Sequence, residues 1–118
     1  MADNAQHNES KYSKLLATLP IAVQECDVDG NITYANEQYE KLAGYAPGEA
    51  TRHTIFERLA DEESRQKLKD YLHYLASEQP TPMAFRNRNI RTSGEEINVE
   101  VTWDYIRDEQ GEVTGFSC

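Results

Sequence analysis

The chain has 118 residues, with 12 basic and 21 acidic side chains and a formal net charge of -9. Nucleic acids and anionic membranes attract proteins through Lys and Arg, so this balance argues against both as partners. Apolar runs such as 21–23 are far shorter than a membrane span, and we expect no direct membrane insertion. The polar start is unlike a signal peptide, and two distant cysteines suit one reduced, cytoplasmic domain.

The N-terminal part of the chain contains one amphipathic segment. Residues 1–9 show no periodicity, and we expect a flexible tail there, followed by a single domain at 10–118. Apolar side chains then recur at helical spacing, which predicts a helix over 11–18 that ends before Pro20. This stripe consists of Tyr12, Leu15, Leu16 and Leu19. It would either cover the outer sheet face of its own domain or pack against a second copy in a symmetric homodimer.

A hairpin and several short helices are expected next. Strands at 21–26 and 32–35 flank an Asp-Gly dipeptide, which favours a tight turn between paired strands. Asn36 is a suitable N-cap for a short helix over 37–43. A single helical turn with three apolar side chains follows at 55–59.

The second half of the chain contains the longest predicted helix, at 62–77, with Asp61 as its N-cap. Its apolar stripe consists of Leu68, Tyr71, Leu72 and Leu75. After this helix the period changes to two, which indicates strands. These strands are expected at 83–91, 97–105 and 113–118. Hairpins at both ends of the chain predict an α+β domain with an antiparallel sheet and helices on one side. Trp103 shares its strand face with other apolar side chains, so we expect it to be buried.

Four short motifs in this order resemble PAS domains of the bacterial sensory-box type. They lie at 27–36, 44–49, 91–95 and 106–116, and include an Asp-Gly turn before a strand, a Gly-Tyr step and two Gly-containing hairpin loops. The resemblance implies a PAS-like, profilin-like fold, with a five-stranded antiparallel sheet in the spatial order 2-1-5-4-3. It also implies helices on one face of that sheet and an N-terminal amphipathic helix.

The resemblance further implies a sensory or adaptor module that is not itself an enzyme. Such modules regulate a C-terminal effector of the same polypeptide, here a diguanylate cyclase or a sensor histidine kinase. Because the chain stops inside the last predicted strand, we expect it to be a fragment of a longer signalling protein. A homodimer is expected, with a small molecule as a candidate partner whose identity the sequence does not give. The alternative is a stand-alone α+β domain that binds a small ligand.

No catalytic or metal-binding arrangement is evident, because no nucleophile, base or paired Cys and His stand at suitable spacing. His53 and His73 are candidate ligand-binding residues. His73 lies on the helix that carries the axial ligand of haem-binding PAS domains, but about a turn beyond the family position. The photoreactive cysteine of flavin-binding members has no counterpart at 52–57. We therefore expect neither haem nor covalently bound flavin, and the cofactor, if there is one, is unknown.

Arg86 and Arg88 share one face of the strand predicted at 83–91, which also carries Asn87 and Asn89. Guanidinium forks and amides bind carboxylates and phosphates, so this strand is a candidate site for an anionic ligand. The alternative is that these charges protect the edge of the sheet from pairing with other strands.

Overall fold

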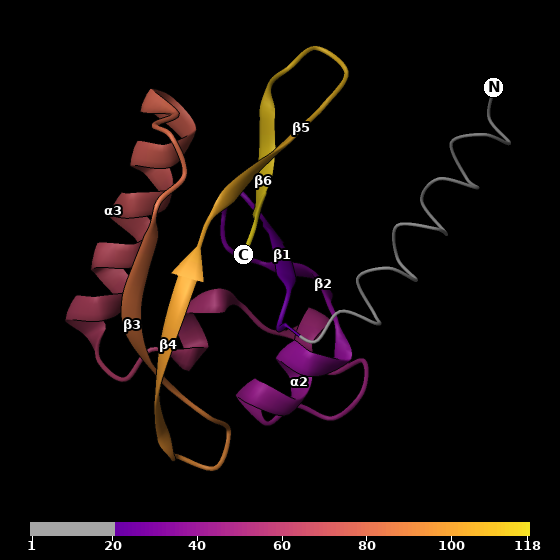
Figure 1. Cartoon of the computed structure of the whole chain (residues 1–118), viewed down its shortest axis with the longest axis vertical. Helices are drawn as coiled ribbons and strands as arrows, with labels where there is room; N and C mark the ends of the chain where they lie inside the picture. The colour runs from indigo at the N-terminus through magenta and orange to yellow at the C-terminus, as the bar shows by residue number, and fades with distance from the viewer. Residues whose placement is uncertain (1–20) are drawn as a thin grey trace, which may run out of the picture.

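A computed structural model of the chain describes residues 21–118. The predicted tail and the predicted helix with its stripe lie outside this range. The elements in chain order are β1 (Gln24–Asp27), β2 (Ile32–Ala35), α2 (Glu37–Ala43), η1 (Ala50–Arg52), η2 (Ile55–Arg58), α3 (Glu62–Glu78), β3 (Ala84–Ile90), β4 (Glu96–Thr102), β5 (Asp104–Arg107) and β6 (Val113–Ser117) (Figure 1). The predicted hairpins, the capped helices and the strands are therefore present, but the strand predicted at 21–26 begins only at Gln24 and the strand predicted at 97–105 is divided in two.

The turn between β1 and β2 is shaped by an aspartate and a glycine. Asp27 Oδ1 accepts hydrogen bonds from the backbone N–H groups of Asp29 and Asn31, at 3.0 and 2.9 Å. Gly30 has a φ of 87°, and a Cβ at this position would collide with the Phe56 ring of η2. The turn thus needs glycine both for its backbone angle and for close contact with the neighbouring helix.

The two α-helices begin at the predicted caps. Asn36 Oδ1 accepts from the N–H of Tyr39, and Asp61 Oδ1 accepts from that of Ser64, at 2.9 and 2.7 Å. Each bond satisfies a donor that a helix N-terminus would otherwise leave without a partner. Helix α2 ends at Gly44 in the left-handed conformation, which a glycine adopts without steric cost.

The strands form two antiparallel sheets instead of the single five-stranded sheet expected. One sheet has the order β2-β1-β6-β5, and the other pairs β3 with β4. The neighbours expected from the order 2-1-5-4-3 are all present, but the long fourth strand is broken at Trp103 into β4 and β5. The break follows from the register: Ser117, the last residue of β6, pairs with Asp104, so β6 does not extend alongside β4.

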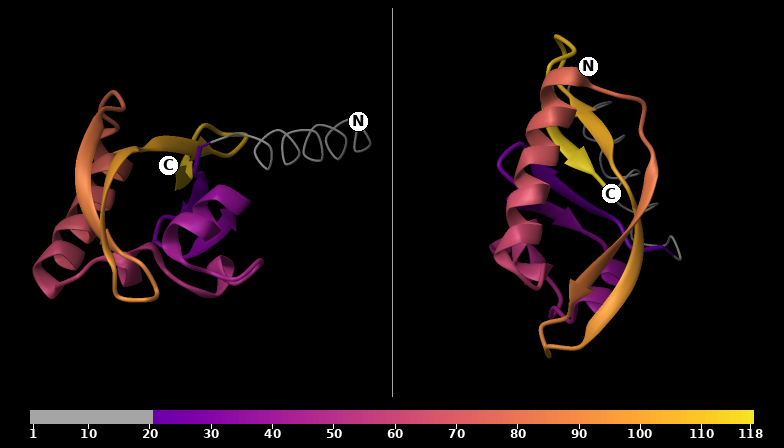
Figure 2. Two further views of the ribbon diagram at one scale, coloured as in Figure 1. Left: turned by 60° about the horizontal axis from the view of Figure 1, so that its bottom comes forward. Right: turned by 90° about the vertical axis from the view of Figure 1, so that its left-hand side faces the viewer.

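The core lies where helix α3 and the short helices meet the four-stranded sheet (Figure 2). It includes the side chains of Cys26 and Phe116 from the sheet and of Leu68, Leu72 and Leu75 from α3. Trp103 is buried, as predicted, with 6% of its surface exposed, and its ring meets Phe116 edge-on at 6.4 Å between centroids. The apolar residues that share its face on β4 are only half-buried. The α+β class is confirmed, although its core is incomplete beside β4.

Candidate functional site

A cavity of about 500 Å³ lies beside this half-buried face of β4. Its apolar wall includes Val23, Leu42, Ile55, Leu59, Leu68 and Val99. These side chains come from the segment before β1, from α2, from η2 and the residue after it, from α3 and from β4. The volume lies within the usual range for small-molecule pockets, which bind ligands mainly through apolar contact.

The ionisable groups inside the cavity stay uncharged near neutral pH. Burial and, to a lesser degree, the neighbouring Cys26 raise the pKa of the Cys118 thiol to about 12, against a hydrogen bond from Gln24 that lowers it. Burial likewise raises the pKa of the Tyr39 hydroxyl. Among the lining residues of the described chain, Glu100 alone carries a formal charge, and its side chain is exposed. The interior of the cavity is therefore uncharged, and the carboxylate of Glu100 makes one side of it negative.

Two buried polar atoms of the cavity-lining residues have no hydrogen-bond partner in the described part of the chain, residues 21–118. Gln24, which is 2% exposed, donates through Nε2 to Cys118 Sγ at 2.7 Å, whereas its Oε1 accepts no bond. The indole Nε1–H of Trp103 likewise has no acceptor. Buried polar groups in native proteins are nearly always paired, so such atoms require an explanation.

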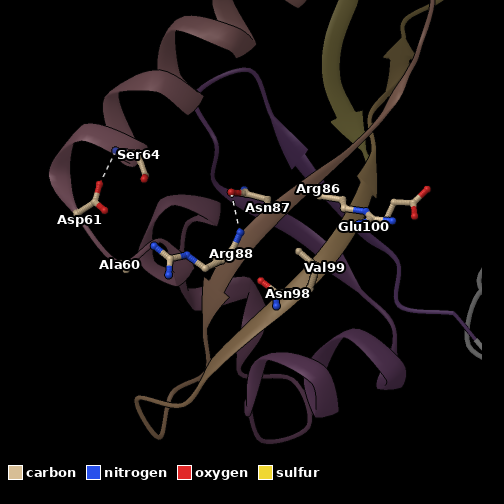
Figure 3. Close-up of a pocket in the computed structure, with 9 residues that line it drawn as sticks. All are labelled: Ala60, Asp61, Ser64, Arg86, Asn87, Arg88, Asn98, Val99 and Glu100. Carbon is tan, nitrogen blue, oxygen red and sulfur yellow. Dashed lines mark hydrogen bonds between the residues drawn. The ribbon is translucent and has the colours of Figure 1, made fainter.

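The predicted arginines line a different, open cleft of about 630 Å³ (Figure 3). Arg86 and Arg88 share it with Ser64 and with the carboxylates of Asp61 and Glu100. Arg88 forms an ion pair with Glu96 at 3.6 Å, and Arg86 stands opposite Glu100 in the register of β3 and β4. Carboxylates of the chain therefore accompany both guanidinium groups, and β3 is a sheet edge, which together favour the edge interpretation over an anion site.

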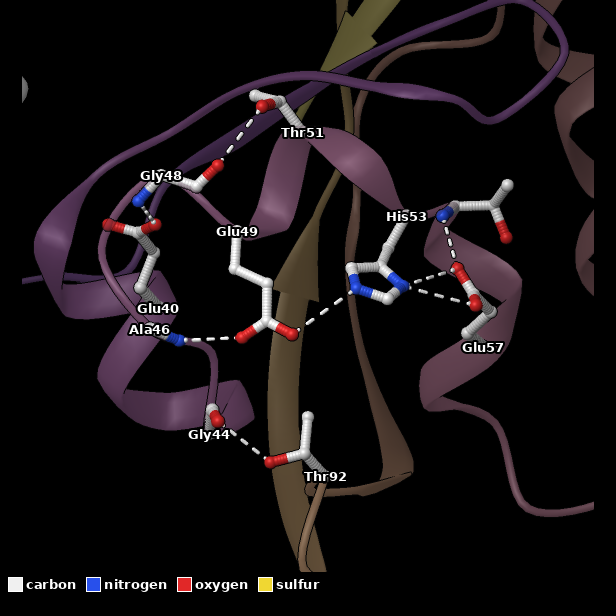
Figure 4. Close-up of polar contacts among 10 residues, drawn as sticks. Glu40, Gly44, Ala46, Gly48, Glu49, Thr51, His53, Glu57 and Thr92 are labelled. Carbon is white, nitrogen blue, oxygen red and sulfur yellow. Dashed lines mark hydrogen bonds and ion pairs between the residues drawn. The ribbon is translucent and has the colours of Figure 1, made fainter.

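His53 belongs to a separate cluster of polar contacts (Figure 4). Its Nε2 lies 3.5 Å from Glu49, its Nδ1 lies 3.2 Å from Glu57, and its ring stacks on Tyr45 at 4.8 Å. A hydrogen bond from the backbone of Ala46 is the main cause that lowers the pKa of Glu49, with His53 contributing. Partial burial opposes ionisation of Glu57, but its bonds to Thr54 and His53 outweigh this and lower its pKa. His53 thus holds η1 and η2 together and does not line the cavity.

The other predicted site residues are also apart from the cavity. His73 is exposed on α3 and lines a small pocket of about 220 Å³ with Phe56 and Lys69. Leu68, about a turn earlier on the same helix, is the α3 residue that lines the large cavity. Within residues 21–118, no three His, Cys, Asp or Glu side chains gather as a metal site would require, and no helix could cross a bilayer.

The two asparagines of the candidate strand differ from its arginines in position: Asn89 lines the cavity and Asn87 lines both the cavity and the open cleft, whereas Arg86 and Arg88 line the cleft alone. The sequence placed these asparagines at an anion-binding strand and did not indicate that they line a separate, mostly apolar cavity. The alternation of side chains along β3 was the available signal. If Trp103 and the residues on its face of the sheet point towards the core, the arginines of the paired strand β3 must lie on the opposite face. No comparable pattern marks Gln24, because a glutamine in a short strand is usually exposed.

Comparison with known proteins identifies the fold family. The sequence matches the PAS fold over residues 10–118, and the chain therefore belongs to the PAS family, whose domains are non-catalytic sensory modules of signal-transduction proteins. No curated protein matches it.

Solved structures show the same fold at low sequence identity. The PAS domain of an HTR-like protein from Haloarcula marismortui has a TM-score of 0.75 and 20% identity, covering 98% of this chain and 93% of that one. A PAS domain from Colwellia psychrerythraea has a TM-score of 0.78 and 16% identity, with coverages of 92% and 90%. A PAS domain from a two-component sensor histidine kinase has a TM-score of 0.73 and 18% identity, with coverages of 96% and 94%.

Proposed function

We propose that this PAS domain acts in the cytoplasm, senses a small molecule in the cavity beside β4, and regulates a C-terminal effector of the same polypeptide. One observation carries the proposal. Cys118 lines the cavity and also exchanges both backbone hydrogen bonds with Gln24, at 2.8 Å each. A ligand in the cavity therefore touches the same residue through which β6 continues towards any segment that follows.

The mechanism is a shift between two arrangements of the sheet. Strand β6 lies between β1 and β5, so a displacement at Cys118 alters the pairing on both sides of it. A ligand that fits one arrangement better than the other increases the population of that arrangement. The effector responds to this population, and the domain itself performs no chemistry.

Native mass spectrometry of the purified chain tests the sensory site. We expect a ligand mass that is retained under native conditions and lost on denaturation. Val99→Phe places a ring in the cavity and should remove that mass. Ile97→Phe is the matched control, because Ile97 lies on the same face of β4 but does not line the cavity. Loss of the mass in both variants, or its retention in both, would contradict the cavity as the site.

The effector is proposed to be a diguanylate cyclase or a sensor histidine kinase. Similarity to a PAS domain from a two-component sensor histidine kinase supports the second, at the level of fold. The test uses the whole polypeptide that continues after Cys118, assayed for cyclic dinucleotide synthesis from GTP and for autophosphorylation from ATP. One of the two activities should be present and should change in Val99→Phe but not in Ile97→Phe. An unchanged activity would leave a stand-alone ligand-binding domain as the better description.

A further inference from the structure

Two buried polar atoms of cavity-lining residues have no hydrogen-bond partner within residues 21–118, and they indicate what kind of ligand the cavity takes. Gln24 and Trp103 are 2% and 6% exposed, and both line the cavity. Within residues 21–118, the carbonyl oxygen of Gln24 has no donor and the indole N–H of Trp103 has no acceptor. Leaving such a buried group unpaired is costly, so an occupant that pairs with both gains affinity that an apolar occupant does not.

The remaining wall restricts the occupant further. Apolar side chains form most of the surface, while Asn87, Asn89 and Thr102 add polar groups along β3 and β4. Among residues 21–118, no lysine, arginine or histidine lines the cavity to balance an anion, and the Glu100 carboxylate would repel one. A cation would find no carboxylate in the interior, because the side chain of Glu100 is exposed. Transfer of an unpaired ion into such surroundings is strongly unfavourable.

Building on the sensory function proposed above, we infer that the ligand is an uncharged, mainly apolar small molecule that carries at least one hydrogen-bond acceptor and one donor. The acceptor takes the indole N–H of Trp103, and the donor serves Gln24 Oε1. Lactams and other secondary amides carry one such acceptor and one such donor.

The single tryptophan of the chain makes this inference directly measurable. Its indole gives one N–H resonance in a ¹⁵N–¹H correlation spectrum. The probes are carbostyril, which is a bicyclic lactam, its N-methyl derivative, which lacks the donor, and naphthalene, which lacks both polar groups. We expect carbostyril to move the indole proton downfield and to bind about tenfold more tightly than naphthalene, with the N-methyl derivative between them.

Variants separate the two hydrogen bonds from shape. Trp103→Phe keeps a ring but removes the N–H, and Gln24→Met keeps the length but removes the carbonyl. Each substitution should reduce the ratio of the affinity for carbostyril to the affinity for naphthalene severalfold. Because a change in cavity size affects the binding of both probes, it largely cancels from this ratio. Gln110→Met, in the exposed loop before β6, is the matched control and should leave the ratio unchanged.

The outcomes distinguish the ligand class from the sensory function. Equal binding of carbostyril and naphthalene would show that the cavity takes ligands but would overturn the donor–acceptor requirement. Equal binding of carbostyril and its N-methyl derivative would overturn the role of Gln24. A ligand mass in native spectra, combined with no response to any of these probes, would overturn the inferred class and leave the sensory function standing.

Discussion

Asn36 joins the segment before β1 to the first turn of α2 through one buried side chain. Its Oδ1 accepts from the N–H groups of Val23 and Tyr39, and its Nδ2 donates to the carbonyl of Ile21, each at 2.9 Å. The residue is 2% exposed, so water does not replace these bonds easily. A helix cap therefore also fixes the segment 21–23, which forms one wall of the cavity.

Replacing Asn36 with alanine should lower the free energy of unfolding by about 2–4 kcal/mol, because a cap is lost and buried backbone groups lose their partners. Urea unfolding followed by circular dichroism measures the loss. Asn98→Ala is the control, since Asn98 is exposed on β4 and should change stability by less than about 0.5 kcal/mol. A loss no greater than that of the control would mean that the three bonds contribute little.

The carboxylate of Asp27 makes the first hairpin sensitive to acid. Partial burial opposes its ionisation, but hydrogen bonds from Asn31, Asp29 and Gly30 outweigh this and hold its pKa below the ordinary 3.8. The stabilisation is complete above that ordinary value, where the carboxyl is ionised in both states. It is lost as the pH falls through the lower pKa of the folded state, because the unfolded chain takes up its proton first.

The stability advantage of the wild type over Asp27→Asn should therefore be largest at neutral pH and shrink as the pH falls towards 3. Urea midpoints measured across this range give the difference between the two proteins, in which the contributions of the other carboxylates cancel. Asp29→Asn, at the exposed position two residues on, serves for comparison. An advantage that is constant with pH would contradict the assigned role of the Asp27 carboxylate.

At the scale of elements, the central strand β6 depends on close contact with β1. Gly115 of β6 pairs with Asp27, and a Cβ at Gly115 would collide with the carbonyl oxygen of Cys26. The backbone of β1 cannot move away freely, because it is also paired with β2. A side chain at this position would therefore force the two central strands apart.

Gly115→Ala should destabilise the domain by about 1–3 kcal/mol, the usual cost of inserting a methyl group into closely packed structure. Thermal unfolding followed by circular dichroism is the measurement. Thr114→Ala is the matched control, because Thr114 is exposed on the same strand and should have a smaller effect. Similar melting temperatures for Gly115→Ala and the wild type would mean that β1 and β6 separate at little cost.

At the scale of the whole molecule, the domain retains a cavity instead of a filled core beside β4. Strand β6 stops at the level of Trp103, so β4 pairs with β3 alone and four consecutive β4 residues, 99–102, line the cavity. Protein interiors are normally packed to the density of organic crystals, so a hollow of this size beside the core is space that a ligand can fill.

Self-association is the second expectation at this scale, and it concerns residues that lie outside the described part of the chain. If the stripe of Leu15 and Leu16 forms a symmetric contact, Leu16→Glu places two charges in one apolar seam and should convert a dimer to a monomer with the fold retained. Sedimentation velocity and circular dichroism measure the two properties. Ser13→Glu adds the same charge off the stripe and should leave the dimer intact. A wild type that is monomeric at high concentration would contradict the dimer.

Local chemistry let the sequence determine much of this fold. The Asp-Gly turn, the caps Asn36 and Asp61, and the two-residue period of the last strands depend on neighbours within a few positions. Their elements accordingly appear where they were predicted, except that the strand predicted at 97–105 is divided into β4 and β5. The burial of Trp103 followed from the same parity argument. Family motifs supplied the pairing of strands, which no local pattern contains.

Tertiary structure alone decided where the long strand breaks and which side chains line the cavity. The break at Trp103 depends on where β6 ends against β5, a register between segments that are distant along the chain. The placement of Asn89 in the cavity and of Arg88 in the open cleft depends on which face of β3 turns towards the core. Gln24 and Trp103 became candidate ligand contacts only once their missing partners were visible. A partner is a property of packing in three dimensions, and the order of residues does not record it.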